Sequence, residues 1–204
     1  MILYADDHLV VADKPSGLLS VPGRGPDKQD CLVVRVQAEF ADALTVHRLD
    51  MATSGLIVLG RGPEAQRRLS IAFSDRQVEK RYVAVVAGTL GTDAGEVDLP
   101  LITDWPNRPR QMVDHDIGKP SLTRYRVVAR EQDRTRVELE PVTGRSHQLR
   151  VHMMALGHPI VGDALYAPPE IAAESERLLL HAEHLVVPHP ETGVKMAFVS
   201  AAPF

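Results

Sequence analysis

Short strand-like runs outnumber helical segments along this chain, and the two kinds do not alternate in a regular order. Within residues 135–141, Val137 and Leu139 alternate with charged side chains, which is the pattern of a half-exposed antiparallel strand. Without a βαβ rhythm, the order predicts an α+β fold with a mixed or mainly antiparallel sheet. The other expected strands are 2–4, 9–12, 56–59, 82–86, 122–128, 178–187 and 196–199.

Three helices are expected between these strands. Asp30 precedes an apolar face formed by Leu32, Val33, Val36 and Phe40, and a side chain of this type can cap a helix. The second helix is expected to start at Pro63, and the third to span residues 146–156 and end at Gly157. Helices this few and this scattered flank a sheet rather than forming a bundle.

The length and composition favour one folded domain. With 204 residues and 44% hydrophobic side chains, the chain suits a single domain over residues 1–204, with room for a groove. Cys31 is the sole cysteine, so an internal disulfide is excluded, and this fits the reducing cytoplasm. Neither a signal peptide nor a membrane span is expected, and a monomer is the default.

The charge balance is ambiguous about the partner. A net charge of −4 and a pI near 6.1 count against a nucleic-acid partner, because such domains are usually basic. The basic residues are nevertheless clustered, within 67–81 and within 108–130. Both a local basic groove and an ordinary solvated surface remain open.

The segment from His47 to Leu56 carries the strongest chemical signal. Asp50 follows a basic pair and a leucine, and a turn at Thr53–Gly55 is expected before an apolar strand. This places the carboxylate on a loop beside the sheet, two residues from Arg48. Asp50 is therefore either a reactive group or a loop aspartate that binds its own backbone.

Three segments together resemble the RluA family of pseudouridine synthases. They are His47–Leu56, Lys80–Gly88 and Thr143–His152, the last continuing to Asp163. Two more, Lys14–Gly23 and Asp104–Pro109, resemble a member of that family that acts on both 23S ribosomal RNA and tRNA. The resemblance implies a bent, mainly antiparallel mixed sheet with flanking helices and a central RNA-binding cleft. It also implies that no separate N-terminal RNA-binding domain is present.

The resemblance assigns roles to several residues. Asp50 corresponds to the catalytic aspartate, Arg145 to an arginine that pairs with it, and Tyr82 to a tyrosine that packs against the target base. Arg48 corresponds to the arginine that fills the gap left by a flipped uridine. From the residues alone, the favoured interpretation of Tyr82 is a core side chain of a strand, and that of Arg145 is a surface residue at a helix start.

Four further residues have two open roles each. His47 is either a phosphate contact or a support of its loop, and Leu149 either lines the uracil pocket or belongs to the core. Arg108 and Arg110 are candidate phosphate contacts in a segment that carries the sole tryptophan, Trp105. That tryptophan either stacks on RNA or anchors its own loop.

The implied reaction is an isomerisation that needs no cofactor and no metal. Uracil leaves the sugar at nitrogen, turns, and reattaches through carbon, so nothing is oxidised or transferred elsewhere. A carboxylate near the ribose either attacks the anomeric carbon or removes a proton from the adjacent carbon, and the sequence does not choose between them.

Two other functions compete with this interpretation. A metal-dependent hydrolase is disfavoured because His147 and His152 are five residues apart and no cysteine pair is present. A non-catalytic RNA-binding or ribosome-assembly module is the second rival. It is disfavoured because Asp50, Tyr82 and Arg145 are all in place.

Overall fold

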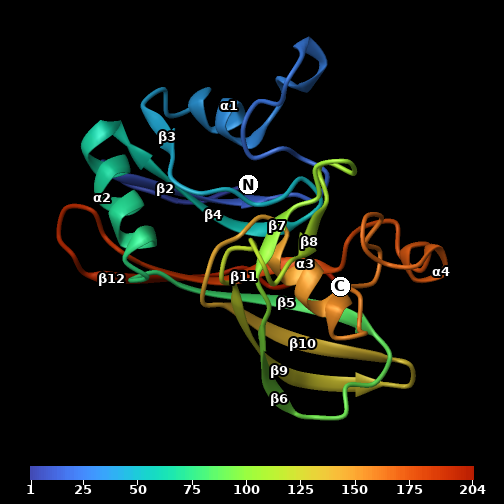
Figure 1. Cartoon of the computed structure of the whole chain (residues 1–204). Coiled ribbons are helices and arrows are strands. Elements are labelled where there is room, and N and C mark those ends of the chain that lie inside the picture. Colours follow the sequence, from blue (N-terminus) through green and yellow to red (C-terminus); the bar gives the residue numbers. More distant parts are fainter. The chain divides into compact units, whose positions relative to one another are not determined.

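A computed structural model describes all 204 residues, which divide into two compact units. The first unit comprises Met1–Lys80 and His181–Pro203, and the second comprises Arg81–Leu180 and Phe204. Both are built from strands with few helices, so the predicted α+β class is confirmed (Figure 1). No helix is both long and apolar enough to cross a membrane. The single catalytic domain over residues 1–204 stays a prediction.

The first unit is a mixed sheet with two helices. Its strands follow the order β1, β2, β4, β11 and β12, with β3 also paired to β4. Only β4 and β11 run parallel, and the other neighbours are antiparallel. The elements are β1 (Ile2–Ala5), β2 (Leu9–Lys14), the 3-10 turn η1 (Pro26–Lys28), α1 (Leu32–Gln37), β3 (Ala43–Thr45), β4 (Ser54–Arg61), α2 (Gly62–Ser74), β11 (Leu180–Pro188) and β12 (Lys195–Val199).

The central strands of this unit are buried on both faces. On β4, Ile57 and Leu59 pack in one hydrophobic cluster with residues of α1. Leu56 and Val58 pack in a second cluster with Leu69 of α2 and with residues of β11. A strand covered on both sides needs apolar side chains at every position, which explains the uninterrupted hydrophobic run in the sequence.

The start of α1 differs from the prediction. The helix begins after Cys31, which is fully buried as expected of a small hydrophobe. Asp30 does not cap it, because the Asp30 carboxylate accepts two hydrogen bonds from the Arg35 guanidinium, at 2.8 and 2.7 Å. The capping prediction was therefore wrong, since a nearby arginine competes successfully for the carboxylate.

The turn before β4 also lies earlier than expected. Its hydrogen bond joins the Thr53 amide to the Asp50 carbonyl at 3.1 Å, and the strand has already begun at Ser54. Gly55 is therefore a strand residue and not a turn residue. Its φ of 114° and its closeness to Ala182 leave no room for a side chain, because a Cβ would collide with the Ala182 backbone.

The second unit contains an antiparallel sheet and a separate hairpin. The sheet has the order β5, β10, β9 and β6, and β7 pairs with β8. Buried Val137 and Leu139 alternate along β10 with more exposed charged side chains, which confirms the predicted half-exposed strand. The elements are β5 (Glu79–Ala87), β6 (Ala94–Asp98), β7 (Leu101–Thr103), β8 (Gln111–Val113), β9 (Leu122–Glu131), β10 (Arg134–Pro141), α3 (Gln148–Ala155) and α4 (Pro169–Ala172).

Helix α3 lies against β8, β9 and β10. The prediction of a helix here is confirmed with shorter bounds, and Gly157 follows its end with a φ of 85°. Leu149 and Met153 are buried as the periodicity indicated. The polar residues Gln148 and His152 are buried as well, so the helix has contacts on most sides rather than on one stripe.

Candidate functional site

The loop that carries Asp50 lies in the first unit, between β3 and β4, and a buried lysine holds it. The Lys14 side chain is fully inaccessible to solvent. Its Nζ donates hydrogen bonds to the carbonyls of Pro15, Leu18 and Met51, at 3.0, 2.7 and 3.1 Å. One ammonium thus ties the residue after Asp50 to the loop that follows β2.

Two serines of the same segment add to this support. Ser16 Oγ donates to the Ala52 carbonyl at 2.7 Å. Ser20 Oγ donates to the Leu49 carbonyl at 2.7 Å and accepts from the Leu49 amide at 3.1 Å. The backbone on both sides of Asp50 is therefore fixed by hydrogen bonds from one short segment, residues 14–20.

His47 has the contacts of a residue that supports the loop. Its Nε2 accepts a hydrogen bond from the Val58 amide at 3.0 Å, and its ring stacks on Phe73 with centroids 4.4 Å apart. Burial, together with the positive charge of Lys80, lowers the pKa of His47 to about 3. The imidazole is therefore neutral at pH 7. A contact between His47 and an RNA phosphate stays a prediction.

Within this loop, exposure alternates from residue to residue. Arg48 is exposed, Leu49 is buried and Asp50 is half-buried. Side chains two positions apart in an extended segment point to the same side, so Arg48 and Asp50 both lie opposite the buried Leu49. A half-buried carboxylate on a fixed loop has what a nucleophile or a general base needs, which is a defined position with access for a substrate.

The turn that carries Arg145 lies in the second unit and depends on buried Gln148. Gln148 Oε1 accepts hydrogen bonds from the Arg145 amide at 3.0 Å and from Thr143 Oγ1 at 2.7 Å. Its Nε2 donates to the Leu122 carbonyl and to Thr123 Oγ1, at 2.9 and 3.0 Å. All hydrogen-bonding positions of this amide therefore connect the turn to the start of β9.

Arg145 itself is exposed, and its Nε donates to the Pro120 carbonyl at 3.3 Å. Two residues later, His147 adopts a left-handed backbone conformation with a φ of 53°. This conformation costs a non-glycine residue about 1–2 kcal/mol, so the surrounding contacts must hold it in place.

The two pocket candidates lie on different elements of the second unit. Tyr82 is a half-buried residue of β5 and lies opposite Leu139 of β10. Leu149 lies in the first turn of α3 and is 7% exposed. Asp50 belongs to the other unit, so the grouping of Asp50 with Tyr82, Arg145 and Leu149 stays a prediction.

The segment between β7 and β8 carries two arginines stacked on aromatic rings. The Arg108 guanidinium lies 4.7 Å from the ring centre of Trp105, which is 65% exposed. The Arg110 guanidinium lies 5.5 Å from the ring centre of Tyr166. Exposed guanidinium groups on aromatic rings suit contacts to phosphates and bases, and Trp105 is exposed rather than an anchor in a core.

The arginines of β9, in contrast, form ion pairs with carboxylates of the same sheet. Arg124 forms ion pairs with Glu96 and Glu140, and Arg126 pairs with Glu138. These cations are neutralised by carboxylates on neighbouring strands, which is the arrangement of an ordinary solvated sheet face. Within the basic cluster at 108–130, Arg108 and Arg110 therefore keep a better case for RNA contact than Arg124 and Arg126.

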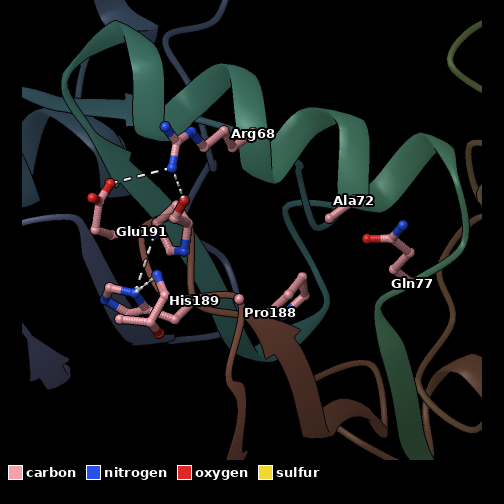
Figure 2. A pocket seen from close by; sticks show the side chains of 9 residues that line it. Arg68, Ala72, Gln77, Pro188, His189 and Glu191 are labelled. Carbon is pink, nitrogen blue, oxygen red and sulfur yellow. Dashed lines mark hydrogen bonds and ion pairs between the residues drawn. The ribbon is translucent and has the colours of Figure 1, made fainter.

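A surface hollow of about 360 Å³ lies in the first unit, between the end of α2 and the turn after β11 (Figure 2). Arg68 there donates to the Pro190 carbonyl and to the Glu191 carboxylate, at 2.7 and 3.2 Å. His189 Nδ1 accepts from the amides of Glu191 and Thr192. These groups are committed to holding the turn, and none of the predicted site residues lines the hollow.

The histidines of the metal hypothesis have other partners. His152 Nδ1 contacts Thr123 Oγ1 at 2.9 Å, and its Nε2 contacts the Leu99 carbonyl at 3.1 Å. Burial lowers the pKa of His152, so the neutral ring is favoured. The structure contains no group of three or more His, Cys, Asp or Glu side chains arranged to hold a metal ion.

Sequence reasoning missed the residues that support the two candidate loops. Lys14, Ser20 and Gln148 were all within recognised motifs, but no role was predicted for them. The available signal was a charged side chain at the end of an apolar strand, as Lys14 follows the run Leu9–Ala12 after one intervening residue. A buried lysine of this kind must find hydrogen-bond acceptors, and loop carbonyls are the usual ones.

Comparisons with known proteins identify the family of the chain. The family model for RNA pseudouridylate synthase matches residues 8–155. The chain is 54% identical over 205 residues to the dual-specificity RNA pseudouridine synthase RluA of Yersinia pestis, covering all of both chains. It is 55% identical to the protein of the same name from Escherichia coli K12, covering 100% of this chain and 94% of that one.

Solved structures give the same result for the fold. Human RNA Pseudouridylate Synthase Domain Containing 1 is similar with a TM-score of 0.84 and 27% identity, over 100% of this chain and 83% of that chain. Human RNA Pseudouridylate Synthase Domain Containing 4 is similar with a TM-score of 0.80 and 27% identity, over 99% and 88% of the two chains.

Proposed function

Because the chain belongs to the RNA pseudouridylate synthase family and is therefore an isomerase that converts uridine in RNA to pseudouridine, we propose that Asp50 is its catalytic carboxylate. The observation that carries this proposal is the support of the Asp50 loop. Lys14, Ser16 and Ser20 fix the backbone on both sides of a half-buried carboxylate. A reacting group that is already fixed can approach one ribose carbon at a small cost in conformational entropy.

The carboxylate has two routes through the reaction. In one, an Asp50 oxygen attacks the anomeric carbon, the bond to the uracil nitrogen breaks, and the sugar ester forms until the uracil carbon displaces it. In the other, Asp50 removes a proton from the adjacent ribose carbon as the bond to the uracil nitrogen breaks; the uracil carbon then adds to the resulting glycal, and the proton returns to the ribose carbon. In both routes the uracil carbon gives up its own proton after the new bond forms, and the nitrogen that left the sugar ends protonated. The carboxylate is unchanged at the end, and no cofactor is needed.

Residues of the second unit complete the proposed site. The Arg145 guanidinium pairs with the Asp50 carboxylate, because a fixed cation favours the anionic form that reacts. Tyr82 packs against the uracil while it turns, and Leu149 lines the same pocket. We also propose that the sheet is bent and that these residues line a central RNA-binding cleft, as expected from the family.

RNA binding is proposed for the exposed arginines. Arg48 fills the space of the flipped uridine, with His47 beside it on the loop, and Arg108 and Arg110 contact phosphates. The stacking of Arg108 on exposed Trp105 supports this, since such a pair offers both a charge and a flat surface to RNA.

The proposed substrates are stem-loops of two RNAs, a 23S ribosomal RNA hairpin and a tRNA anticodon arm. Two relatives of more than half identity are named as dual-specificity RNA enzymes, which supports an enzyme with more than one substrate. Sequence-tolerant recognition of this kind depends on RNA shape and on bases that leave the stack. We further propose that the enzyme works in the cytoplasm, as a monomer, without a metal or cofactor.

The test is a map of pseudouridine in total RNA from cells with the gene, without it, and with the Asp50→Asn variant. Asparagine preserves the shape of the side chain but lacks the anionic oxygen, so we expect the modified positions to be lost in both altered strains. The purified variant should bind RNA nearly as well as the wild type while its turnover falls by about ten-thousand-fold or more.

Two outcomes would count against the proposal. Turnover by Asp50→Asn near the wild-type rate would remove Asp50 from the chemistry. An unchanged pseudouridine map without the gene, combined with tight RNA binding, would instead favour the non-catalytic RNA-binding or assembly module.

A further inference from the structure

Tyr166 connects two segments of the second unit that are far apart in sequence. Its hydroxyl oxygen accepts a hydrogen bond from the Gln111 amide at 2.8 Å, at the start of β8. The same hydroxyl lies 2.6 Å from His147 Nδ1, at the end of the turn that carries Arg145. The side chain is only 5% exposed, so both hydrogen bonds are shielded from water.

The ring of Tyr166 is fixed from its buried side. The Arg150 guanidinium lies 5.0 Å from the ring centre and makes two hydrogen bonds to the Asp163 carboxylate, at 2.8 and 2.7 Å. Asp163 Oδ1 also accepts from the amides of Leu165 and Tyr166. Tyr166 is therefore a rigid point, and the segments that contact its hydroxyl are held by it.

The exposed side chain of Arg110 also lies over the ring of Tyr166. Its guanidinium lies 5.5 Å from the ring centre, and Gln111 follows directly in the chain. The segment from Asp104 to Arg110 joins β7 to β8 and presents Trp105 and Arg108 to solvent. One buried tyrosine thus contacts the end of this exposed loop through both its ring and its hydroxyl.

The Arg145 turn depends on the other hydrogen bond of the tyrosine. Gln148 holds the turn from the side of β9, whereas His147 has the left-handed backbone conformation that its neighbours must maintain. The imidazole contacts Tyr166 both through Nδ1 and edge to face, with ring centroids 5.6 Å apart. The loss of this contact would release a strained residue two positions from Arg145.

We propose that Tyr166 is a positioning residue for Arg145, and that it couples the Asp104–Arg110 loop to the Thr143–His147 turn. The inference rests on the proposed function, which gives the loop to RNA phosphates and Arg145 to the Asp50 carboxylate. RNA that orders the loop fixes Gln111 against the hydroxyl, and this lowers the cost of ordering His147 and the turn. Arg145 is then held best when the right RNA is bound.

The first experiment measures the coupling in the free protein, without any activity. Tyr166→Phe keeps the ring between Arg110 and Arg150 but removes both hydrogen bonds. We expect amide hydrogen exchange to become about tenfold faster in residues 104–111 and also in 143–148, as one hydrogen bond's worth of protection is lost in each segment.

The matched control is Tyr125→Phe. Tyr125 is a buried tyrosine of the same unit, and its hydroxyl contacts Thr92 Oγ1 at 2.7 Å, outside both segments. This variant should leave the exchange of 104–111 and 143–148 unchanged. Faster exchange in only one of the two segments of Tyr166→Phe would overturn the proposal, because the segments would then not be coupled.

The second experiment measures single-turnover isomerisation and RNA affinity. We expect Tyr166→Phe to slow the single-turnover step by about tenfold, while the Kd for a substrate stem-loop changes by less than about twofold. Tyr125→Phe should match the wild type in both. In the Arg145→Ala background, Tyr166→Phe should cause no further loss, since the tyrosine acts through the arginine.

A full additional loss in the Arg145→Ala background would contradict the proposal and indicate a general structural role. The outcomes are separate from those of the proposed function, which depends on Asp50→Asn. If Asp50→Asn is inactive and Tyr166→Phe is fully active, the proposed function stands and the role of Tyr166 falls.

Discussion

The Asp50 loop and the Arg145 turn are held in different ways. The Asp50 loop is tied by Lys14, the last residue of β2, and by Ser16 and Ser20 of the segment that follows it. The Arg145 turn is tied by Gln148 and, through His147 and Tyr166, to a segment that presents side chains to solvent. The difference is that the hydrogen bonds described for the Asp50 loop come from one short segment of the first unit, whereas the proposed coupling through Tyr166 makes the order of the Arg145 turn depend on the Asp104–Arg110 loop.

The largest effect is expected when the buried ammonium that holds the Asp50 loop is removed. Lys14→Met removes a fully buried ammonium and its three hydrogen bonds, of which the one to the Leu18 carbonyl is buried, so we expect the free energy of unfolding to fall by about 3 kcal/mol. Urea unfolding followed by circular dichroism measures this. Lys195→Met, which removes an exposed ion pair with Glu79, is the control and should change little. Equal stabilities of the two variants would show that the buried ammonium does not fix the loop.

Removal of the Arg145 guanidinium tests the role proposed for the Arg145 turn. Arg145→Ala should lower the single-turnover rate by about 100-fold, because the proposed carboxylate loses the charge that favours its reactive form. Arg145→Lys keeps a positive charge and should lose less of the rate. Arg124→Ala, which affects an exposed ion pair of β9, should leave the rate unchanged. A wild-type single-turnover rate in Arg145→Ala would mean that the proposed pair with Asp50 does not exist.

The stability of the Asp50 loop's own unit should depend on pH through His47. Its pKa of about 3 in the folded protein lies below the usual value of 6.5, so the neutral ring contributes stability that is present above pH 6.5 and lost as the pH falls toward 3. At pH 5 the loss is about 2 kcal/mol. His47→Gln keeps an acceptor for the Val58 amide and does not titrate, so it should lack this part of the acid sensitivity. A wild type and variant that lose the same stability between pH 7.5 and 5 would refute the assignment.

The smallest effect is expected on the exposed side of the Asp50 loop. Arg48→Ala should slow base flipping by about three- to tenfold, since a planar cation recovers part of the unstacking cost. The salt slope of RNA binding should change by no more than about one phosphate contact. A stem-loop with 2-aminopurine beside the target reports flipping by fluorescence. Normal flipping with greatly weakened binding would make Arg48 a phosphate clamp.

Local patterns predicted the regular elements well. The alternation around Val137 and the buried run at Leu56–Leu59 identified β10 and β4, because one- or two-sided burial dictates the spacing of apolar residues. The boundary errors came from competition at longer range. Asp30 binds Arg35 rather than capping α1, and Gly55 serves the close approach of Ala182 rather than a turn.

The candidate site was predictable only as a set of motifs. Asp50 stood out because its neighbours mark a loop, but its support by Lys14 depends on residues 37 positions apart. Gln148 and Tyr166 looked like ordinary members of a helix and a loop, since nothing in a sequence shows which distant amide a buried side chain meets. Polar contacts of this kind follow from the tertiary structure and not from local spacing.

The order of the segments along the chain has a consequence for synthesis on the ribosome. The second unit is nearly continuous, whereas the first is assembled from Met1–Lys80 and His181–Pro203. Its strand β4, which directly follows the Asp50 turn, pairs with β11, and Ser54 meets His181 at 2.8 Å across 127 positions of sequence. The Asp50 loop therefore leaves the ribosome early, whereas the sheet that includes β4 is completed only when β11 and β12 have been made. Residues 81–180 can fold first, and the N-terminal segment must wait unfinished for strands that are translated near the end.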